Sequence, residues 1–198
     1  MDDLQKLKSD IANCRICAER FAATHTGHEP RPVVWFDRAP RIVIHGQAPG
    51  LRVHKSGRPF DDPSGDRLRD WMGIDAATFY DMARIAIVPM AFCFPGYNAA
   101  GSDLPPPKIC AQTFYSQFTA KIQPPKLTLL VGGYAQKWHM GVKTGVTDTV
   151  LAWRDHAPRL FPLPHPSWRN TAWIKKNPWF ETDLLPALRH QVNEALNG

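Results

Sequence analysis

The sequence predicts an α/β fold, namely a single three-layer α/β/α domain with a central, mainly parallel sheet of about four strands. Short apolar runs rich in β-branched residues recur along the chain, and most are followed by a loop and a segment with helical spacing. Strands that alternate with helices pair in parallel, because each crossover returns the chain to the same end of the sheet. The 198 residues contain no internal repeat and no linker-like stretch, so we expect one domain over residues 1–198.

Several apolar runs are candidate strands. The run at residues 85–90 is apolar throughout, which is typical of a central strand that is covered on both faces. The expected strands cover residues 33–36, 41–44, 85–90, 127–131 and 159–163.

Helices are expected where apolar residues recur every three or four positions. Residues 3–12 show this spacing at Leu4, Leu7 and Ile11, which would share one face of a helix. The expected helices cover residues 3–12, 66–72, 76–82, 108–122, 135–140, 147–153 and 178–196.

The composition is that of a soluble, basic protein. Hydrophobic residues make up 43% of the chain and charged residues 21%, and the formal net charge is +6. A positive net charge favours polyanionic partners such as DNA. No apolar run is long enough to span a bilayer, and the chain starts with acidic residues where a secretory signal would be basic. We expect a cytoplasmic protein without a membrane partner, and a monomer.

A glycine-rich turn follows the strand expected at 41–44. Small residues let the backbone come close to a ligand at the carboxyl end of a strand, which is where open α/β sheets bind ligands. An ordinary turn between a strand and a loop is the alternative for this stretch alone. The turn reads Gly46, Gln47, Ala48, Pro49 and Gly50, and Gly57, Arg58, Pro59 and Phe60 follow closely.

A second motif lies far downstream and also follows an expected strand, the one at 159–163. The carboxyl ends of parallel strands meet at one edge of a sheet, so the two motifs are expected to converge there. The second motif reads His165, Pro166, Ser167, Trp168, Arg169 and Asn170.

The four cysteines are Cys14 and Cys17, separated by two residues, and the more distant Cys93 and Cys110. A reducing cytoplasm disfavours a disulfide framework. Small zinc modules usually use two close pairs, and Cys93 and Cys110 are not a close pair. Buried inert cysteines, structural zinc and a [4Fe–4S] cluster held by four thiolates all remain open from spacing alone.

Together, the two motifs and the cysteines resemble the uracil-DNA glycosylase superfamily, and most closely its iron–sulfur branch, the family 4 type. Enzymes of that type typically read Gly-Glu-Ala-Pro-Gly, then Gly-Arg-Pro-Phe, then a late His-Pro-Ser or His-Pro-Ala. The likeness runs from the first cysteines to the final helix. It implies a DNA glycosylase of base-excision repair, which hydrolyses the N-glycosidic bond of a flipped-out deaminated base, uracil or a related one, in damaged DNA.

The resemblance also implies roles for individual residues. His165 would donate a hydrogen bond to the base oxygen as negative charge develops there, and an ordinary loop histidine is the alternative. Phe60 would stack on the base ring, and a core phenylalanine is the alternative. The four cysteines would bind a [4Fe–4S] cluster, with structural zinc in the same ligands as the alternative. The first motif would line the substrate site with Gly46, Ala48, Pro49 and Gly50.

Two positions depart from the family pattern. Gln47 stands where family 4 has a carboxylate, and an amide can position water but cannot act as a general base. Asp61 is the candidate replacement, together with Asp62, and a solvated turn or helix cap is the alternative for both. Pro89 stands where the family usually has an asparagine that reads uracil, and Asn98 on the following loop is a candidate to compensate.

The residues after the second-motif histidine lie where the family contacts DNA. Ser167, Trp168, Arg169 and Asn170 lie where the family inserts a wedge and holds phosphates. Arg169, with Lys175 and Lys176, would bind the DNA backbone, and either Trp168 or Trp173 would act as the wedge. Arg58 adds positive charge close to the first motif. An exposed aromatic side chain and a solvated charged loop are the alternatives for these residues.

Gln47 and Pro89 leave a second function open, that of a non-catalytic DNA- or lesion-binding member of the same superfamily. Such a protein would keep the pocket and the cysteines but would not hydrolyse the glycosidic bond. An excision assay on a panel of damaged bases separates the two functions.

Overall fold

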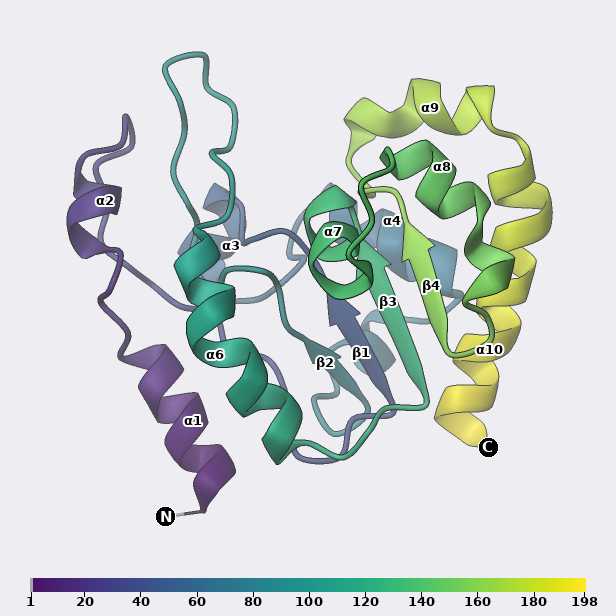
Figure 1. Ribbon diagram of the computed structural model, residues 1–198, viewed down its shortest axis with the longest axis horizontal. Helices are drawn as coiled ribbons and strands as arrows, with labels where there is room; N and C mark the ends of the chain where they lie inside the picture. The colour runs from purple at the N-terminus through teal and green to yellow at the C-terminus, as the bar shows by residue number, and fades with distance from the viewer. Residues whose placement is uncertain (1) are drawn as a thin grey trace.

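The sheet has four parallel strands, and their order across the sheet is β2-β1-β3-β4. The computed structural model describes residues 2–198, so Met1, the first residue of the predicted domain, lies outside the described residues. The strands are β1 (Ile42–His45), β2 (Ile85–Ile87), β3 (Leu127–Val131) and β4 (Leu160–Leu163). Helices lie on both faces of this sheet (Figure 1), which confirms the predicted three-layer α/β/α fold.

The strands are buried on both faces, because their side chains are apolar in both directions. In β1, Ile42 and Ile44 pack into one hydrophobic cluster and Val43 packs into the other. Ile44 lies opposite Ile87 of β2 and Leu129 of β3 in the parallel register. This two-sided burial explains why the strands read as continuous apolar runs rather than as alternating ones.

Helices α1, α6 and α7 cover one face of the sheet. Leu4, Leu7 and Ile11 of α1 are all buried on this side, as their helical spacing predicted. Helix α6 lies between α1 and the sheet edge and contributes Phe114 and Phe118 to the same cluster. The bounds are α1 (Asp3–Ala12), α6 (Lys108–Lys121) and α7 (Gly133–Met140).

The other face is covered mainly by α4 (Pro63–Met72), α8 (Val146–Leu151) and α10 (Leu185–Asn197). Helix α4 begins where the carboxylate of Asp62 accepts a hydrogen bond of 3.0 Å from the Gly65 amide. This cap is important for the site, because it orients the stretch directly after Phe60. The short helix α5 (Ala76–Phe79) follows α4 and adds Phe79 to the core.

Three short helices were not predicted from the sequence. They contain five or six residues each, which is too short for a 3.6-residue period to be visible. The predicted helix at 178–196 is also not uniform, because a π-helical turn at Phe180–Leu184 precedes α10. The three unpredicted helices are α2 (Ala18–Ala22), α3 (Leu51–Ser56) and α9 (Thr171–Lys176).

The strand predicted at 33–36 was wrong. This segment makes one isolated antiparallel bridge, between Trp35 and Ile87, and it does not join the sheet as a strand. The strand predicted at 85–90 is also shorter, although Val88 still donates a backbone hydrogen bond to Ile44 of β1. The physical reason is that side chains occupy the carbonyl oxygen of Val88, which accepts hydrogen bonds from the Tyr115 hydroxyl at 2.6 Å and from His45 Nδ1 at 2.9 Å.

Among residues 2–198, no helix combines the length and the apolar composition that crossing a membrane requires.

Candidate functional site

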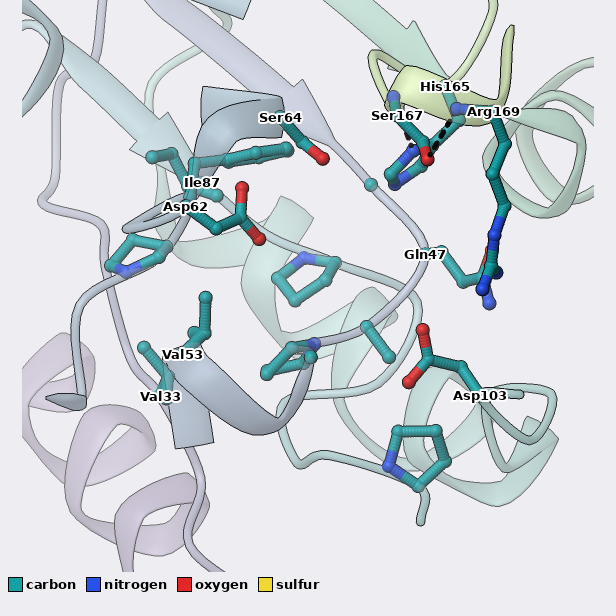
Figure 2. A pocket seen from close by; sticks show the side chains of 18 of the residues that line it. Val33, Gln47, Val53, Asp62, Ser64, Ile87, Asp103, His165, Ser167 and Arg169 are labelled. Carbon is teal, nitrogen blue, oxygen red and sulfur yellow. Dashed lines mark hydrogen bonds between the residues drawn. The ribbon is translucent and has the colours of Figure 1, made fainter. Parts of the chain in front are cut away.

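A cavity of about 390 Å³ lies at the carboxyl edge of the sheet, next to the ends of β1 and β4. This volume is in the range of small-molecule sites. Figure 2 shows the cavity with side chains from the loops after both strands turned toward it. The first motif and the second motif therefore share one site, as the parallel topology predicted. The lining includes Gly46, Gln47, Ala48, Pro49, Gly50, Phe60, Asp62, Ser64, Pro89, Asp103, His165, Ser167, Arg169 and Asn170.

The imidazole of His165 is held in one tautomer. The backbone N–H of Ser167 donates a hydrogen bond of 3.2 Å to His165 Nδ1 (Figure 2). A nitrogen that accepts this bond cannot carry a proton, so the neutral ring carries its proton on Nε2. Burial lowers the pKa of His165, against a smaller opposing influence of the Asp62 carboxylate. At neutral pH, His165 is therefore an uncharged ring that presents one N–H donor at the cavity.

The loop that carries His165 is fixed at both ends. The side-chain amide of Asn170 donates a hydrogen bond of 2.7 Å to the carbonyl oxygen of His165. Arg67 of α4 donates to the carbonyl oxygen of Ser167 at 3.0 Å and to the Thr171 hydroxyl at 3.2 Å. These bonds join the second motif to the helix that follows the first motif, so the two halves of the site keep a fixed spacing.

Phe60 adopts a left-handed backbone conformation, with φ of 53°, which is unusual for a residue other than glycine. A side-chain carbon added to Gly46 would lie 3.5 Å from the ring of Phe60, so this ring packs beside the first motif. The hydroxyl of Tyr80 donates a hydrogen bond of 3.0 Å to the Phe60 carbonyl oxygen. Phe60 thus lines the cavity in an orientation that neighbouring residues impose on it.

Of the two neighbouring acids, Asp62 lines the cavity and Asp61 is not among the lining residues. Asp62 caps α4 through one carboxylate oxygen, and this anchors its side chain on the cavity side of the turn. Gln47 also lines the cavity, from the loop after β1 (Figure 2). Of the two candidate acids, the structure therefore brings the carboxylate of Asp62 to the site and not that of Asp61.

Pro89 and Asn98 are placed differently from each other. Pro89 lines the cavity, at a point where the Met90 amide donates a backbone hydrogen bond of 2.9 Å to Gly46. Asn98 is exposed and lies outside the lining. Its side-chain oxygen accepts hydrogen bonds from the Ala100 and Ser102 amides, both at 3.0 Å. Asn98 is therefore a turn residue in this structure, and it does not reach the site.

The residues expected to contact DNA divide into two groups. Ser167, Arg169 and Asn170 line the cavity, whereas Trp168 is 72% exposed beside it. A large aromatic ring with that exposure on the rim of a cavity is free to contact a ligand. Arg58 lies outside the lining, and its guanidinium stacks on the Tyr80 ring at 3.8 Å.

Asp103 is a lining residue that the sequence did not single out. It lies in the loop between the third and fourth cysteines, where one acidic residue among small and proline residues gives no distinctive pattern. Burial raises the pKa of Asp103, the charge of Arg169 opposes this, and the charge of Asp62 adds to it. In Figure 2, Asp62 and Asp103 turn their carboxylates toward the cavity from different elements.

All four cysteines line a second, apolar pocket between the end of α1 and the start of α6. They are free thiols, each partly exposed. Burial raises the pKa of Cys93 to about 12 and that of Cys110 to about 11. Thiolates are unfavourable in an apolar pocket, because their negative charge is poorly solvated there. A bound metal cation balances that charge, so these thiols would ionise when metal binds. The donor set therefore fits an iron–sulfur cluster, since each thiolate would bind a different iron.

The cysteines are less well arranged for a single ion. Within the described part of the chain, no three histidine, cysteine, aspartate or glutamate side chains are grouped so that they could hold one metal ion.

The fold and the cavity define a class of protein, an α/β/α protein with a base-sized site at the carboxyl edge of a parallel sheet. This site combines a neutral histidine donor, an aromatic ring and a carboxylate. The family model described as the Uracil DNA glycosylase superfamily matches residues 34–189 of the chain. The chain therefore belongs to the uracil DNA glycosylase superfamily, whose members are generally DNA glycosylase hydrolases. The matched region includes both motifs, and it begins after Cys14 and Cys17.

Proposed function

We propose that the protein is a DNA glycosylase that hydrolyses the N-glycosidic bond of a flipped-out deaminated base, uracil or a related one, in base-excision repair. The observation that carries this proposal is the His165 ring, whose Nδ1 is occupied by the Ser167 amide at 3.2 Å. That bond leaves Nε2–H as a donor toward a cavity large enough for a nucleobase.

The departing base takes up negative charge on its oxygen in the transition state. A donor that is already oriented stabilises this charge without further reorganisation. A neutral imidazole serves as that donor over the whole pH range above its lowered pKa. The ring of Phe60 supplies a flat apolar surface for the base.

Hydrolysis also requires an oriented water molecule. Gln47 can accept and donate hydrogen bonds but cannot take up a proton at neutral pH. We assign the water-activating role to Asp62, because its carboxylate lines the cavity and acts electrostatically on His165. Gln47 then orients the water or the base edge from the other side.

Binding to DNA is proposed to centre on the rim of the cavity. Arg169 lines it and Trp168 projects beside it. The exposed Lys175 and Lys176 at the end of α9 extend the positive charge along the same edge. The protein would bind damaged DNA through phosphate contacts, as a monomer.

The four cysteines are proposed to bind a [4Fe–4S] cluster, which would place the protein with the iron–sulfur, family 4 type of the superfamily. The pocket gathers thiols from the start of the chain and from the loop between β2 and α6. A cluster there would hold these segments together, and structural zinc is the alternative cofactor.

The test is an excision assay on oligonucleotides that carry uracil, hypoxanthine, xanthine or other damaged bases. Replacing His165 with alanine should lower the rate by about a hundredfold to a thousandfold while binding changes little. Asp62→Asn and Asp61→Asn form a matched pair, because the two acids are neighbours and only Asp62 lines the cavity. We expect a large loss of rate for Asp62→Asn and little change for Asp61→Asn.

The alternative is a non-catalytic protein that binds DNA or lesions. Gln47 at the cavity favours it, since the family carboxylate is absent from that position. If the protein binds lesion DNA tightly but releases no base from the whole panel, the glycosylase function is wrong and the binding function replaces it. A gain of uracil excision in Gln47→Glu would show that the amide limits water activation.

A further inference from the structure

The loop between the third and fourth cysteines contains a small, tightly bonded hairpin at residues 96–104. Tyr97 and Asp103 form an antiparallel bridge at its centre. Leu104 donates to Gly96 at 2.8 Å below this bridge, and Asn98 donates to Ser102 at 2.9 Å above it. The hairpin therefore presents the side chain of Asp103 from a defined backbone position.

The base of the hairpin is anchored to the neighbouring loop. The Tyr97 amide lies 3.4 Å from the Thr26 hydroxyl, to which it donates. A side-chain carbon on Gly96 would lie within 3 Å of Thr24, so the two loops are in close contact. The ring of His28 is also hydrogen-bonded to the carbonyl oxygen of Phe94 at 2.9 Å. The loop that carries Asp103 is thus fixed against residues 24–28.

The carboxylate of Asp103 has no partner of its own. Within residues 2–198 it makes no hydrogen bond and no ion pair, and the residue lines the cavity with an exposed side chain. The positive charge of Arg169 lies close enough to favour its ionised form. Both carboxylate oxygens are therefore free to accept a hydrogen bond from a ligand bound in the cavity, so the position is suited to recognition.

We infer that Asp103 is a specificity-determining residue that accepts a hydrogen bond from the base, and that it favours hypoxanthine over uracil. This inference rests on the proposed glycosylase function and names the substrate class of the same site. It also supplies a base-edge contact at a site where Pro89 has no side-chain hydrogen bond to offer.

The preference follows from the atoms on the two base edges. In uracil, the ring N–H of the base-pairing edge lies between two carbonyl oxygens. An ionised carboxylate that accepts from this N–H therefore meets a carbonyl oxygen on either side. In hypoxanthine, the equivalent N–H has one carbonyl oxygen on one side and a C–H on the other. Because an ionised carboxylate is an acceptor only, it repels the additional oxygen of uracil. An amide at residue 103 would instead donate to that oxygen while accepting from the N–H.

The experiment compares excision of hypoxanthine and uracil by the unmodified protein and by Asp103→Asn, under single-turnover conditions. We expect the unmodified protein to prefer hypoxanthine and the variant to raise the ratio of uracil to hypoxanthine by about tenfold or more. Asp148→Asn is the matched control, because Asp148 is exposed on α8 and has no hydrogen bond or ion pair of its side chain within residues 2–198. A thermal unfolding scan of each variant checks that the fold is kept.

The outcomes separate the inference from the proposed function. If the unmodified protein excises bases and Asp103→Asn leaves the ratio as it was, the inference is wrong and the glycosylase function stands. If the unmodified protein excises nothing, the glycosylase function is wrong. The ratio of its affinities for hypoxanthine and uracil oligonucleotides, with and without Asp103→Asn, then tests the role of Asp103 directly. An unchanged affinity ratio would overturn it.

Discussion

The carbonyl oxygen of Phe60 accepts a hydrogen bond of 3.0 Å from the Tyr80 hydroxyl, and it lies where a side chain on residue 65 would have to go. A side-chain carbon on Gly65 would be 1.8 Å from that oxygen. Two residues outside the cavity lining therefore determine how the aromatic ring of the site is held. Tyr80 is in turn packed by Trp35 and by the guanidinium of Arg58.

Replacing Tyr80 with phenylalanine should impair both catalysis and stability. The variant loses two hydrogen bonds, the one donated to the Phe60 carbonyl oxygen and the one accepted from Arg69 at 3.1 Å, each worth about 1 kcal/mol of unfolding free energy. Because Phe60 loses its anchor in a strained conformation, we expect excision to slow by about tenfold at saturating DNA. Tyr134→Phe is the control, since Tyr134 is exposed. Equal rates for the two variants would contradict a positioning role of Tyr80.

Replacing Gly65 with alanine should destabilise the protein and displace Phe60. Overpacking of this kind typically costs about 1–3 kcal/mol, and the contact here is with backbone, which yields least. Gly145→Ala is the matched control, because nothing lies within 4 Å of a side-chain carbon at that position. Urea unfolding of both variants measures the difference. Similar midpoints would mean that the turn after Phe60 adapts easily.

The cysteine pocket predicts an iron-dependent fold. Protein purified without oxygen should be brown and contain iron and sulfide, and Cys14→Ser or Cys110→Ser should lose both. The thiols join the start of the chain to its middle, so losing a ligand should also lower the midpoint of thermal unfolding. Stoichiometric zinc without iron in the unmodified protein would instead support the structural zinc site.

Arg169 should contribute to DNA affinity without regard to sequence. Neutralising phosphates releases counterions, so binding should weaken steeply as salt is added. Arg169→Ala should weaken binding to every duplex about equally and reduce the slope of affinity against salt by about one. Lys126→Ala is the control, since Lys126 precedes β3 at the opposite edge of the sheet. A loss restricted to lesion DNA would place Arg169 in base recognition.

The stability of the protein should fall in mild acid. His45 and His139 stack with ring centroids 4.0 Å apart, and burial lowers their pKa values to about 3 and about 4. Unfolded chains bind these protons near pH 6.5, so the stabilisation is complete above that pH and is lost as the pH falls toward the folded values. The slope of the unfolding free energy against pH should approach about 2.7 kcal/mol per pH unit for the two histidines together.

Urea unfolding at pH 7 and pH 5 measures that slope. His139→Phe keeps an aromatic ring against His45 but removes one of the two groups that take up a proton on unfolding. The slope of the unfolding free energy against pH should therefore fall by about half. His190→Gln is the control, because His190 is exposed on α10. An unchanged slope in His139→Phe would mean that other groups dominate the acid response.

The sequence by itself determined the layers of the fold and the two motif loops. Apolar periodicity is local, so it predicted the strand at 127–131 and the helix at 3–12 with the bounds that the structure has. Parallel topology then required that the loops after β1 and β4 meet at one edge, and the structure shows that they do.

Only the tertiary structure decided which polar groups reach the cavity. Asp61 and Asp62 are adjacent residues of the same type, so the sequence does not distinguish them. The side chain of Asp62 lines the cavity because it caps α4, and composition does not reveal this hydrogen bond. Asp103 lines the cavity because the hairpin at residues 96–104 packs against residues 24–28. Asn98 does not reach the cavity, because its side chain accepts hydrogen bonds within the turn of that hairpin. Side-chain direction depends on long-range contacts, whereas periodicity depends on neighbours along the chain, and this is why the fold was predictable and the site was only partly so.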